Sequence, residues 1–491
     1  MLFSSMVFIW CFLPIVLILN FIIGLVIPYP VTKIKIKNIM LLLASLVFYA
    51  WGSIYYVLIM ITSIIVNFLG GLLIDRFKES KIKGLLLFID ITLNLLILIY
   101  FKYFNFIIII IENIHSIGGN TIINIYNMLT MNGTGALGFK EVVLPIGISF
   151  FTFQSMSYVV DVYREDAKVK KNILDFGLYV ALFPQLIAGP IVKYKDVEYD
   201  INNRIENIET FASGVKRFCY GMGKKVIIAN TMAELADSIW ALNIENIGFI
   251  IAWCGIFAYA LQIYYDFSGY SDMAIGLGRM FGFDFKENFN YPYISLSIQE
   301  FWRRWHISLS TWFKEYVYIP LGGNRTGNTY VNLFIVFLLT GIWHGANFTF
   351  IAWGVLYGII LVVERLFLGR FLKWNKLKII NVIYVLMIVN ILWVFFRADN
   401  IYMALDYVKA MFTLESKYTI LNFLSMKVII AFLLGIIFMG PHFVIFGKLY
   451  EKIKNSIIVN LVDTAIYISL LLYSIITITS GTYNPFIYFQ F

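Results

Sequence analysis

Two histidines stand in polar motifs of a chain that is otherwise strongly apolar. His344 lies in GIWHGANFTF (341–350) and His306 lies in FWRRWHISLS (301–310), and the chain has only four histidines in 491 residues. A neutral imidazole can accept a proton from a hydroxyl near neutral pH, so both residues are candidates for general acid–base chemistry. An ionisable group at membrane depth is costly, and this cost suggests a function.

His344 also has a purely structural interpretation, in which it bridges helices by hydrogen bonds and does no chemistry. Gly341 and Gly345 would then permit close helix packing around it. The same glycines could instead open space for a substrate beside the ring. We favour the functional interpretation, because placing an imidazole among apolar residues needs a reason beyond packing.

The residues around His306 predict a helix that begins after Ser297. Ser297 and Glu300 match a capping box, and Glu300 and Arg304 are spaced for an ion pair. Pro320 is expected to end this helix. Four residues would share its buried face: Trp302, His306, Leu309 and Phe313. The segment taken alone favours an interfacial anchoring helix, since Trp and Arg concentrate at membrane boundaries, and His306 would then be incidental.

Other chemistries have weaker support in the sequence. The two histidines lack a third ligand at a useful spacing for zinc, and we expect neither a metal nor a bound cofactor. A G-x-S-x-G elbow and a P-loop are both absent. The three scattered cysteines are expected to be free thiols. Asp266 and Asp272 could form a proton relay, which keeps a transporter as an alternative.

The composition indicates what kind of scaffold must position these side chains. Hydrophobic residues make up 60% of the chain and charged residues 14%, whereas soluble domains are about one quarter charged. Apolar runs such as 8–27 and 85–101 can each cross a membrane, and their continuous pattern predicts helices. We therefore expect an all-α polytopic membrane protein of about eleven transmembrane helices. It should form one domain over residues 1–491 around a central polar cavity, with a motif-rich region at 262–354.

The basic residues predict the orientation of this bundle. The net charge is +9, and the lysines gather in short segments between apolar runs, at 33–37 and 75–83 for example. The positive-inside rule places these segments in the cytoplasm and the N-terminus outside, with the loop 112–140 external. We therefore expect a multi-pass protein of the cell membrane, embedded in the lipid bilayer, and no nucleic-acid partner.

One apolar segment is too short and too broken for an ordinary span. Residues 176–192 contain Pro184, Gly189 and Pro190, and basic residues flank both ends. Two flanks on the same side of the membrane predict a re-entrant hairpin, because broken backbone is tolerated at membrane depth where protein buries it. A helix kinked at Pro184 is an equal alternative.

These motifs together resemble the membrane-bound O-acyltransferase family, in particular its bacterial branch of alginate and related polysaccharide O-acetylases. The resemblance extends along nearly the whole chain. Besides the two histidine motifs, it rests on LPIGISFFTFQSMSYVVDVYR (144–164), FPQLIAGPIVKY (183–194), YYDFSGYSDMAIGLGRMFGF (264–283), FFRADN (395–400) and PFIYFQF (485–491).

The resemblance implies that His344 is the catalytic histidine and that His306 is a second functional histidine. The candidate substrate-binding residues are Arg303, Arg304, Trp305, Asn347 and Asp266. It also implies transfer of an acetyl group from cytoplasmic acetyl-CoA toward hydroxyls of an extracellular polysaccharide. His344 would act as general base, and His306 would orient a substrate or stabilise the oxyanion. A periplasmic or cell-surface partner with a serine-hydrolase-like acetyltransferase domain often completes this pathway.

Two alternative functions stay open at this point. One is D-alanyl transfer to teichoic acid within the same family, although PLGGNR and FFRADN favour the acetylase branch. The other is a proton-coupled transporter that uses Asp266, Asp272 and His344. The acetylase hypothesis also carries a geometric requirement, since His344 must be reachable from at least one side of the membrane.

Overall fold

The protein is helical throughout the part of the chain that the structure describes. The computed structural model describes residues 1–115, 121–131, 141–374, 378–441, 456–481 and 483–487, and no residue in these ranges belongs to a strand. Seven helical segments are long and apolar enough to cross a membrane: Phe8–Val26, Ile54–Arg76, Ile82–Ile114, Phe249–Met280, Phe348–Leu372, Lys378–Arg397 and Ile457–Ser480. This confirms an all-α, multi-pass membrane protein.

The remaining expected crossings differ from full-length spans. Two apolar helices are shorter, α16 (Thr329–His344) and α21 (Met426–Phe438). Another, α7 (Ile148–Arg164), has 17 residues, and nearly all of them are buried against protein. A helix surrounded by other helices does not have to match the thickness of the hydrocarbon core, so the apolar runs of the sequence overstate the number of lipid-exposed spans.

The N-terminal part consists of membrane-facing helices joined by short turns. It contains η1 (Phe8–Phe12), α1 (Leu13–Val26), α2 (Pro30–Ala50), α3 (Ile54–Arg76), α4 (Ile82–Leu98), η2 (Ile99–Tyr103), α5 (Phe104–His115) and α6 (Thr121–Leu129). The lysines at 33–37 lie inside α2 and not in a loop, because Pro30 starts the helix earlier than the apolar pattern indicates. The expected external loop 112–140 includes α6, and its residues 116–120 and 132–140 lie outside the described ranges.

The broken segment 176–192 is buried inside the protein. The helix α8 (Ile173–Ala181) stops before Leu182, and α9 (Phe183–Leu186) is followed by irregular backbone. Lys170 before the segment donates a hydrogen bond to Asn202 of α10 (Tyr194–Asn203), so the two ends meet on one side. This arrangement agrees with the re-entrant prediction and not with a kinked span.

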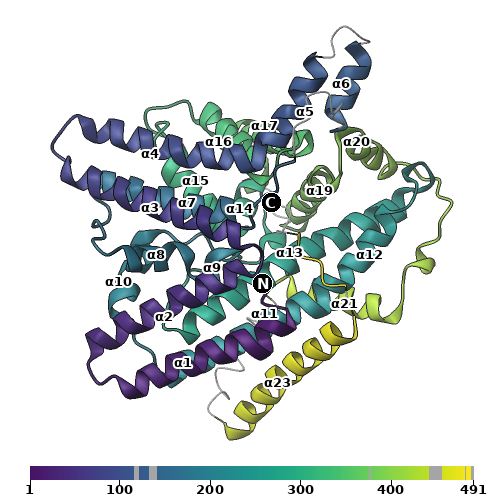
Figure 1. The fold of residues 1–491 in the computed structure, drawn as a ribbon. Helices are drawn as coiled ribbons and strands as arrows, with labels where there is room; N and C mark the ends of the chain where they lie inside the picture. The colour runs from purple at the N-terminus through teal and green to yellow at the C-terminus, as the bar shows by residue number, and fades with distance from the viewer. Residues whose placement is uncertain (116–120, 132–140, 375–377, 442–455, 482, 488–491) are drawn as a thin grey trace.

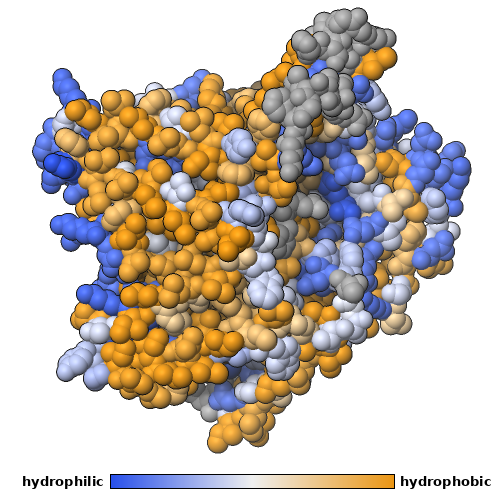
Figure 2. Space-filling view, viewed as in Figure 1, coloured by the Kyte–Doolittle hydropathy of each residue, from blue (hydrophilic) through white to orange (hydrophobic). Residues whose placement is uncertain are grey.

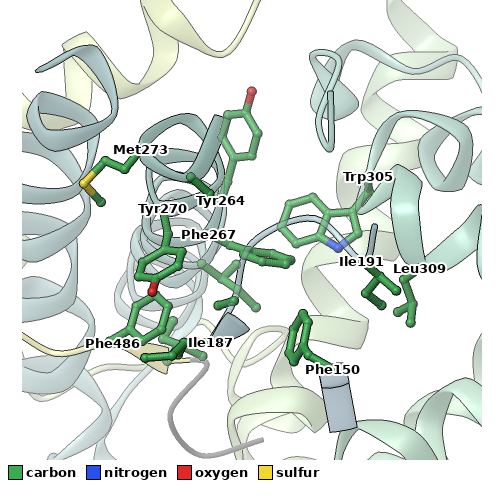
Figure 3. Close-up of a cluster of buried hydrophobic side chains, with 14 of the residues drawn as sticks. Phe150, Ile187, Ile191, Tyr264, Phe267, Tyr270, Met273, Trp305, Leu309 and Phe486 are labelled. Atoms are coloured by element: carbon green, nitrogen blue, oxygen red, sulfur yellow. The ribbon is translucent and has the colours of Figure 1, made fainter. Parts of the chain in front are cut away.

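The centre of the molecule is the helix α13 (Phe249–Met280), nearly all of which is buried (Figure 1). Glycine pairs hold α11 (Ile208–Gly223) directly against it: a Cβ added at Gly214 would lie 2.6 Å from the Gly276 carbonyl oxygen. The chain between these helices forms η3 (Lys224–Ala229), α12 (Asn230–Trp240) and η4 (Ile244–Asn246). In Figure 3, Phe267 of α13 lies among Ile187, Ile191 and Leu309, so the re-entrant segment packs into this core.

The C-terminal part carries both histidine motifs. It contains η5 (Pro292–Ile294), α14 (Ile298–Arg304), α15 (Ile307–Phe313), η6 (Lys314–Tyr318), α16 (Thr329–His344), α17 (Phe348–Val363), η7 (Glu364–Leu368), α18 (Gly369–Trp374), α19 (Lys378–Arg397), α20 (Ile401–Ala410), η8 (Ile420–Asn422), α21 (Met426–Phe438) and α23 (Ile457–Ser480). His442 lies outside the described residues.

The surface divides into an apolar belt and two hydrophilic margins (Figure 2). The belt covers the face formed by α1 to α4, where large apolar side chains such as Phe21, Leu25 and Leu58 are exposed. One margin is held together by ion pairs of lysines, including Lys83 with Glu165 and Lys193 with Glu315. We call this margin the basic face, and the positive-inside rule predicts that it is cytoplasmic.

Candidate active site

His344 is the last residue of α16, which begins at the basic face and rises about 24 Å along its 16 residues. The helix ends there because Gly345 adopts an extended conformation, and Asn347 then caps α17 by accepting a hydrogen bond from the Thr349 amide. His344 therefore lies deep within the bundle, at a sharp junction between two helices.

The glycines of this motif serve close packing. A Cβ added at Gly341 would collide with the Phe350 carbonyl oxygen and lie 2.9 Å from the Cα of Gly354. A Cβ added at Gly345 would collide with the Phe350 ring. Of the two interpretations of these glycines, the structure thus supports close packing of α16 on α17 and not an open space beside the imidazole.

Aromatic rings surround the His344 side chain, which is only 2% exposed. The centroid of its ring lies 4.9 Å from those of Trp343 and Phe396 and 5.1 Å from that of Trp353, each in an edge-to-face arrangement. Such a cage fixes the ring plane of the imidazole and keeps bulk water away from it.

His306 lies in a break between α14 and α15, and this corrects the predicted continuous helix. Its backbone is in the left-handed region, with φ of 43°, a conformation that side chains other than glycine rarely adopt. Asn288, which lies 18 residues upstream, stabilises this backbone conformation through its side chain. Its Oδ1 accepts hydrogen bonds from the Ser308 amide and hydroxyl and lies 3.1 Å from His306 Nδ1.

The capping box that was predicted before this break is present. Ser297 Oγ accepts a hydrogen bond from the Glu300 amide, and Arg304 pairs with Glu300 at 2.8 Å. The four residues expected on one buried face are all buried even though the helix is broken: Trp302, His306, Leu309 and Phe313. His306 is therefore part of the protein core, contrary to the interfacial anchoring interpretation.

One aromatic cluster joins the two histidine motifs. The Trp343 ring lies next to that of His344, and its centroid is 6.2 Å from that of His306. Phe150 of α7 packs on Trp343 at 5.7 Å, and Phe267 of α13 packs on His306 at 4.7 Å (both phenylalanines are labelled in Figure 3). Residues 38 positions apart in the sequence thus share one buried site.

Burial and charge set the protonation of the groups near the site that lie outside the spanning helices. Burial lowers the pKa of His306, so its imidazole is neutral at physiological pH. On the basic face, burial alone would raise the pKa of Glu315, but hydrogen bonds from Lys193 and Lys195 outweigh it and hold the pKa below its usual range.

A cleft opens toward the basic face. It consists of two adjoining cavities of about 480 and 770 Å³ that share Trp302, Arg303, Phe337 and Arg365 in their walls. Its deepest residue on α16 is Thr340, one turn before His344. Five cationic residues line these two cavities: Arg303, Lys314, Arg365, Arg370 and Lys378.

A second cavity, of about 500 Å³, opens on the opposite face. Asn347, Phe350 and Phe396 line it. The helix α19 extends from one space to the other, since it starts at Lys378 in the wall of the basic-face cleft and ends at Arg397 in the wall of the opposite-face cavity. Its 20 residues rise about 30 Å, which is the thickness of a hydrocarbon core.

His344 lies between these two spaces, and aromatic side chains separate it from each. Phe396 contacts the imidazole and lines the opposite-face cavity. Toward the basic face, Trp353 contacts the imidazole and Trp302, whose ring is 5.6 Å from that of Trp353, lines the cleft. The imidazole is in the wall of neither space, so the access expected from the sequence is not open in this structure. A substrate from either space reaches it only when these rings move.

The other predicted site residues have different surroundings. Arg303 lines the basic-face cleft and Asn347 the opposite-face cavity, whereas Arg304 is engaged by Glu300. Trp305 is buried and stacks on Phe301.

The two aspartates of the transporter alternative are both held in ion pairs. Asp266 forms a buried ion pair with Lys225 at 2.6 Å and accepts a hydrogen bond from the Ile487 amide. Asp272 is held by Arg217 and Lys224. Neither aspartate is in the wall of the basic-face cleft or of the opposite-face cavity, so the structure does not join them to His344 in a relay.

Comparison with known proteins decides the family. A model of the membrane-bound O-acyltransferase family matches residues 95–405, which include both histidine motifs. The chain belongs to this family. As a membrane-bound O-acyltransferase it is an enzyme, and this membership argues against the proton-coupled transporter.

Several relatives that cover most of this chain are named O-acetylases or O-acetyltransferases, whereas a teichoic acid D-alanyltransferase of Streptococcus thermophilus is 30% identical over only 50% of this chain. The chain is 44% identical to a probable alginate O-acetylase of Pseudomonas aeruginosa, over 84% of this chain and 75% of that protein. It is 39% identical to a probable alginate O-acetylase of Pseudomonas putida over the full length of both chains. It is 37% identical to a peptidoglycan O-acetyltransferase of Helicobacter pylori, over 84% of this chain and 80% of that protein.

Proposed function

We propose that this membrane-bound O-acyltransferase moves an acetyl group from cytoplasmic acetyl-CoA toward hydroxyls of an extracellular polysaccharide, with His344 as the general base. The observation that carries the proposal is the place of His344 between a basic cleft on one face and a polar cavity on the other. The names of the relatives, alginate O-acetylase and peptidoglycan O-acetyltransferase, support an acetyl group and a glycan acceptor.

The basic-face cleft suits a CoA thioester. The volumes of its two cavities are within the range of small-molecule sites. Positive charge for the phosphates of CoA comes from Arg303, Arg365, Arg370 and Lys378. The pantetheine arm would pass Trp302 and Phe337 toward Thr340, which places the thioester next to the last turn of α16. No cofactor has to be bound, because acetyl-CoA enters and CoA leaves.

The reaction follows from the chemistry of a neutral imidazole. His344 takes the proton of the acceptor hydroxyl as its oxygen attacks the thioester carbonyl carbon. The carbon–sulfur bond then breaks, the ester is formed, and the proton passes to the leaving thiolate. His306, neutral and fixed at Nδ1 by Asn288, orients a substrate or stabilises the oxyanion.

The opposite-face cavity would admit the acceptor. Asn347, Asp237 and Arg397 offer hydrogen-bonding groups in its wall, and Phe396 separates it from His344. The hydroxyl that enters belongs either to the polymer or to a cell-surface acetyltransferase that passes the acetyl group on. Both routes use the same base.

The test is acetyl transfer from radiolabelled acetyl-CoA in membranes that contain the wild type, His344→Ala or His306→Ala at matched abundance. Loss of a general base should lower the acetylation of polymer about 100-fold or more for His344→Ala. A parallel reaction with an activated D-alanyl donor separates the teichoic-acid alternative. If both histidine variants keep full acetylation, the site assignment is wrong.

A further inference from the structure

A lysine at membrane depth lies next to the His344 motif and has no role in the mechanism above. Lys102 belongs to η2, in the middle of the spanning segment Ile82–Ile114, and is only 8% exposed. Burying an ammonium group in a membrane protein is expensive, so its position calls for strong local interactions and suggests a function.

The described partners of Lys102 are Trp343 and Ser149, which lie beside the two histidine motifs. Its Nζ donates a hydrogen bond to the Trp343 carbonyl oxygen, the peptide group directly before His344. It donates a second hydrogen bond to Ser149 Oγ at 3.2 Å, and it lies 5.5 Å from the centre of the Trp343 ring. Ser149 precedes Phe150, which packs on both Trp343 and His306.

Tyr103, the next residue, reaches the neighbouring peptide group. Its hydroxyl donates a hydrogen bond of 2.5 Å to the Ile342 carbonyl oxygen. The last carbonyls of any α-helix lack partners within the helix, and they carry the negative end of the helix dipole. Two consecutive residues of η2 therefore donate hydrogen bonds to two consecutive carbonyls at the end of α16.

We propose that Lys102 and Tyr103 are positioning residues for His344. They fix the last turn of α16, and through it the direction in which the imidazole points between the two cavities. Lys102 also ties this turn to α7 through Ser149, so it sets the distance between the two histidine motifs. This inference rests on the proposed role of His344 as the base.

The kinetic test compares Lys102→Met, Lys102→Arg and Tyr103→Phe with the wild type. Met keeps the approximate length of the side chain and removes the amino group and its hydrogen bonds. Displacing a catalytic group by about 1 Å costs about 100-fold, so kcat for acetyl transfer should fall about 100-fold for Lys102→Met, with KM for acetyl-CoA within about 2-fold. Arg should restore part of kcat, and Tyr103→Phe should lower it about 10-fold.

Lys37→Met is the matched control. Lys37 is also a buried lysine, but its ion pair is with Glu206 at the basic face, and its loss should leave kcat unchanged. A second measurement does not depend on the chemistry: deuterium exchange of the peptide around 338–345 should be faster in Lys102→Met and unchanged in Lys37→Met.

These measurements separate failure of this inference from failure of the proposed function. Activity of His344→Ala in the same assay would refute the base itself. If His344→Ala is inactive while Lys102→Met and Tyr103→Phe retain wild-type kcat, the positioning inference is refuted. If Lys102→Met does not fold, Tyr103→Phe decides, because it removes a single hydroxyl.

Discussion

At the scale of single residues, His306 has a strained backbone conformation that a neighbouring side chain maintains. A left-handed backbone at a residue other than glycine costs about 1–3 kcal/mol and persists only where the surroundings enforce it. Asn288 provides that enforcement, since it joins the His306 side chain to the start of α15. The strain therefore turns the imidazole into the aromatic cluster and not along a helix face.

Replacing Asn288 should release this conformation. Asn288→Ala removes the acceptor for the amide and hydroxyl of the half-buried Ser308, so we expect about 1–3 kcal/mol lower stability and about 10-fold lower acetyl transfer. Thermal unfolding in detergent and the radiolabel assay measure these effects. Asn290→Ala is the control, because Asn290 is an exposed asparagine two residues away. If Asn288→Ala and Asn290→Ala had the same stability and the same acetyl transfer, Asn288 would have no role in positioning His306.

At the scale of elements, the packing of α16 on α17 fixes the depth of His344. The two helices touch at Gly341 and Gly354, where a Cβ at Gly354 would lie 2.5 Å from the Phe337 carbonyl oxygen. Backbone cannot move aside as a flexible side chain can, so any side chain here pushes the helices apart.

Gly354→Ala should therefore destabilise the protein by about 1–3 kcal/mol and reduce acetyl transfer, although Ala is the better helix former. The readouts are the melting temperature and the specific activity per inserted protein. In Gly24→Ala the new Cβ would meet only the end of Lys37 at 3.5 Å, so this variant should match the wild type. A Gly354→Ala protein as stable and active as Gly24→Ala would contradict this account of the helix pair.

The same scale shows what sequence reasoning can reach. The capping box at Ser297 and the ion pair of Glu300 with Arg304 are local, and both were predicted. The break at His306 was not, because it depends on Asn288, 18 residues away, whose side chain gives no signal in a local pattern. Lys102 was visible as a lysine inside an apolar run, but only the fold reveals that it binds the carbonyl beside His344.

At the scale of the whole molecule, the proposed assignment of the donor to one face rests on the charge of that face. The basic-face cleft has Arg303 and Arg365 in the shared wall of its two cavities. Arg303→Gln and Arg365→Gln should each raise KM for acetyl-CoA about 10-fold with little change in kcat, since each removes a charge-assisted contact to phosphate remote from the reacting carbonyl.

Initial rates over a range of acetyl-CoA concentrations check this prediction. Lys427→Gln is the control, because Lys427 forms an exposed ion pair with Glu234 on helices that do not line the cleft. A lower kcat with an unchanged KM in the two arginine variants would place the donor elsewhere.

The opposite-face cavity is built from both ends of the described chain: Leu2 lies in its wall together with Asn484 and Pro485, and Asn484 donates a hydrogen bond to Ser4. Ser4 and Asn484 are 480 residues apart along the chain. The cavity proposed for the acceptor therefore forms only when segments from distant parts of the chain have come together, so a protein in which they have separated lacks the proposed acceptor pocket.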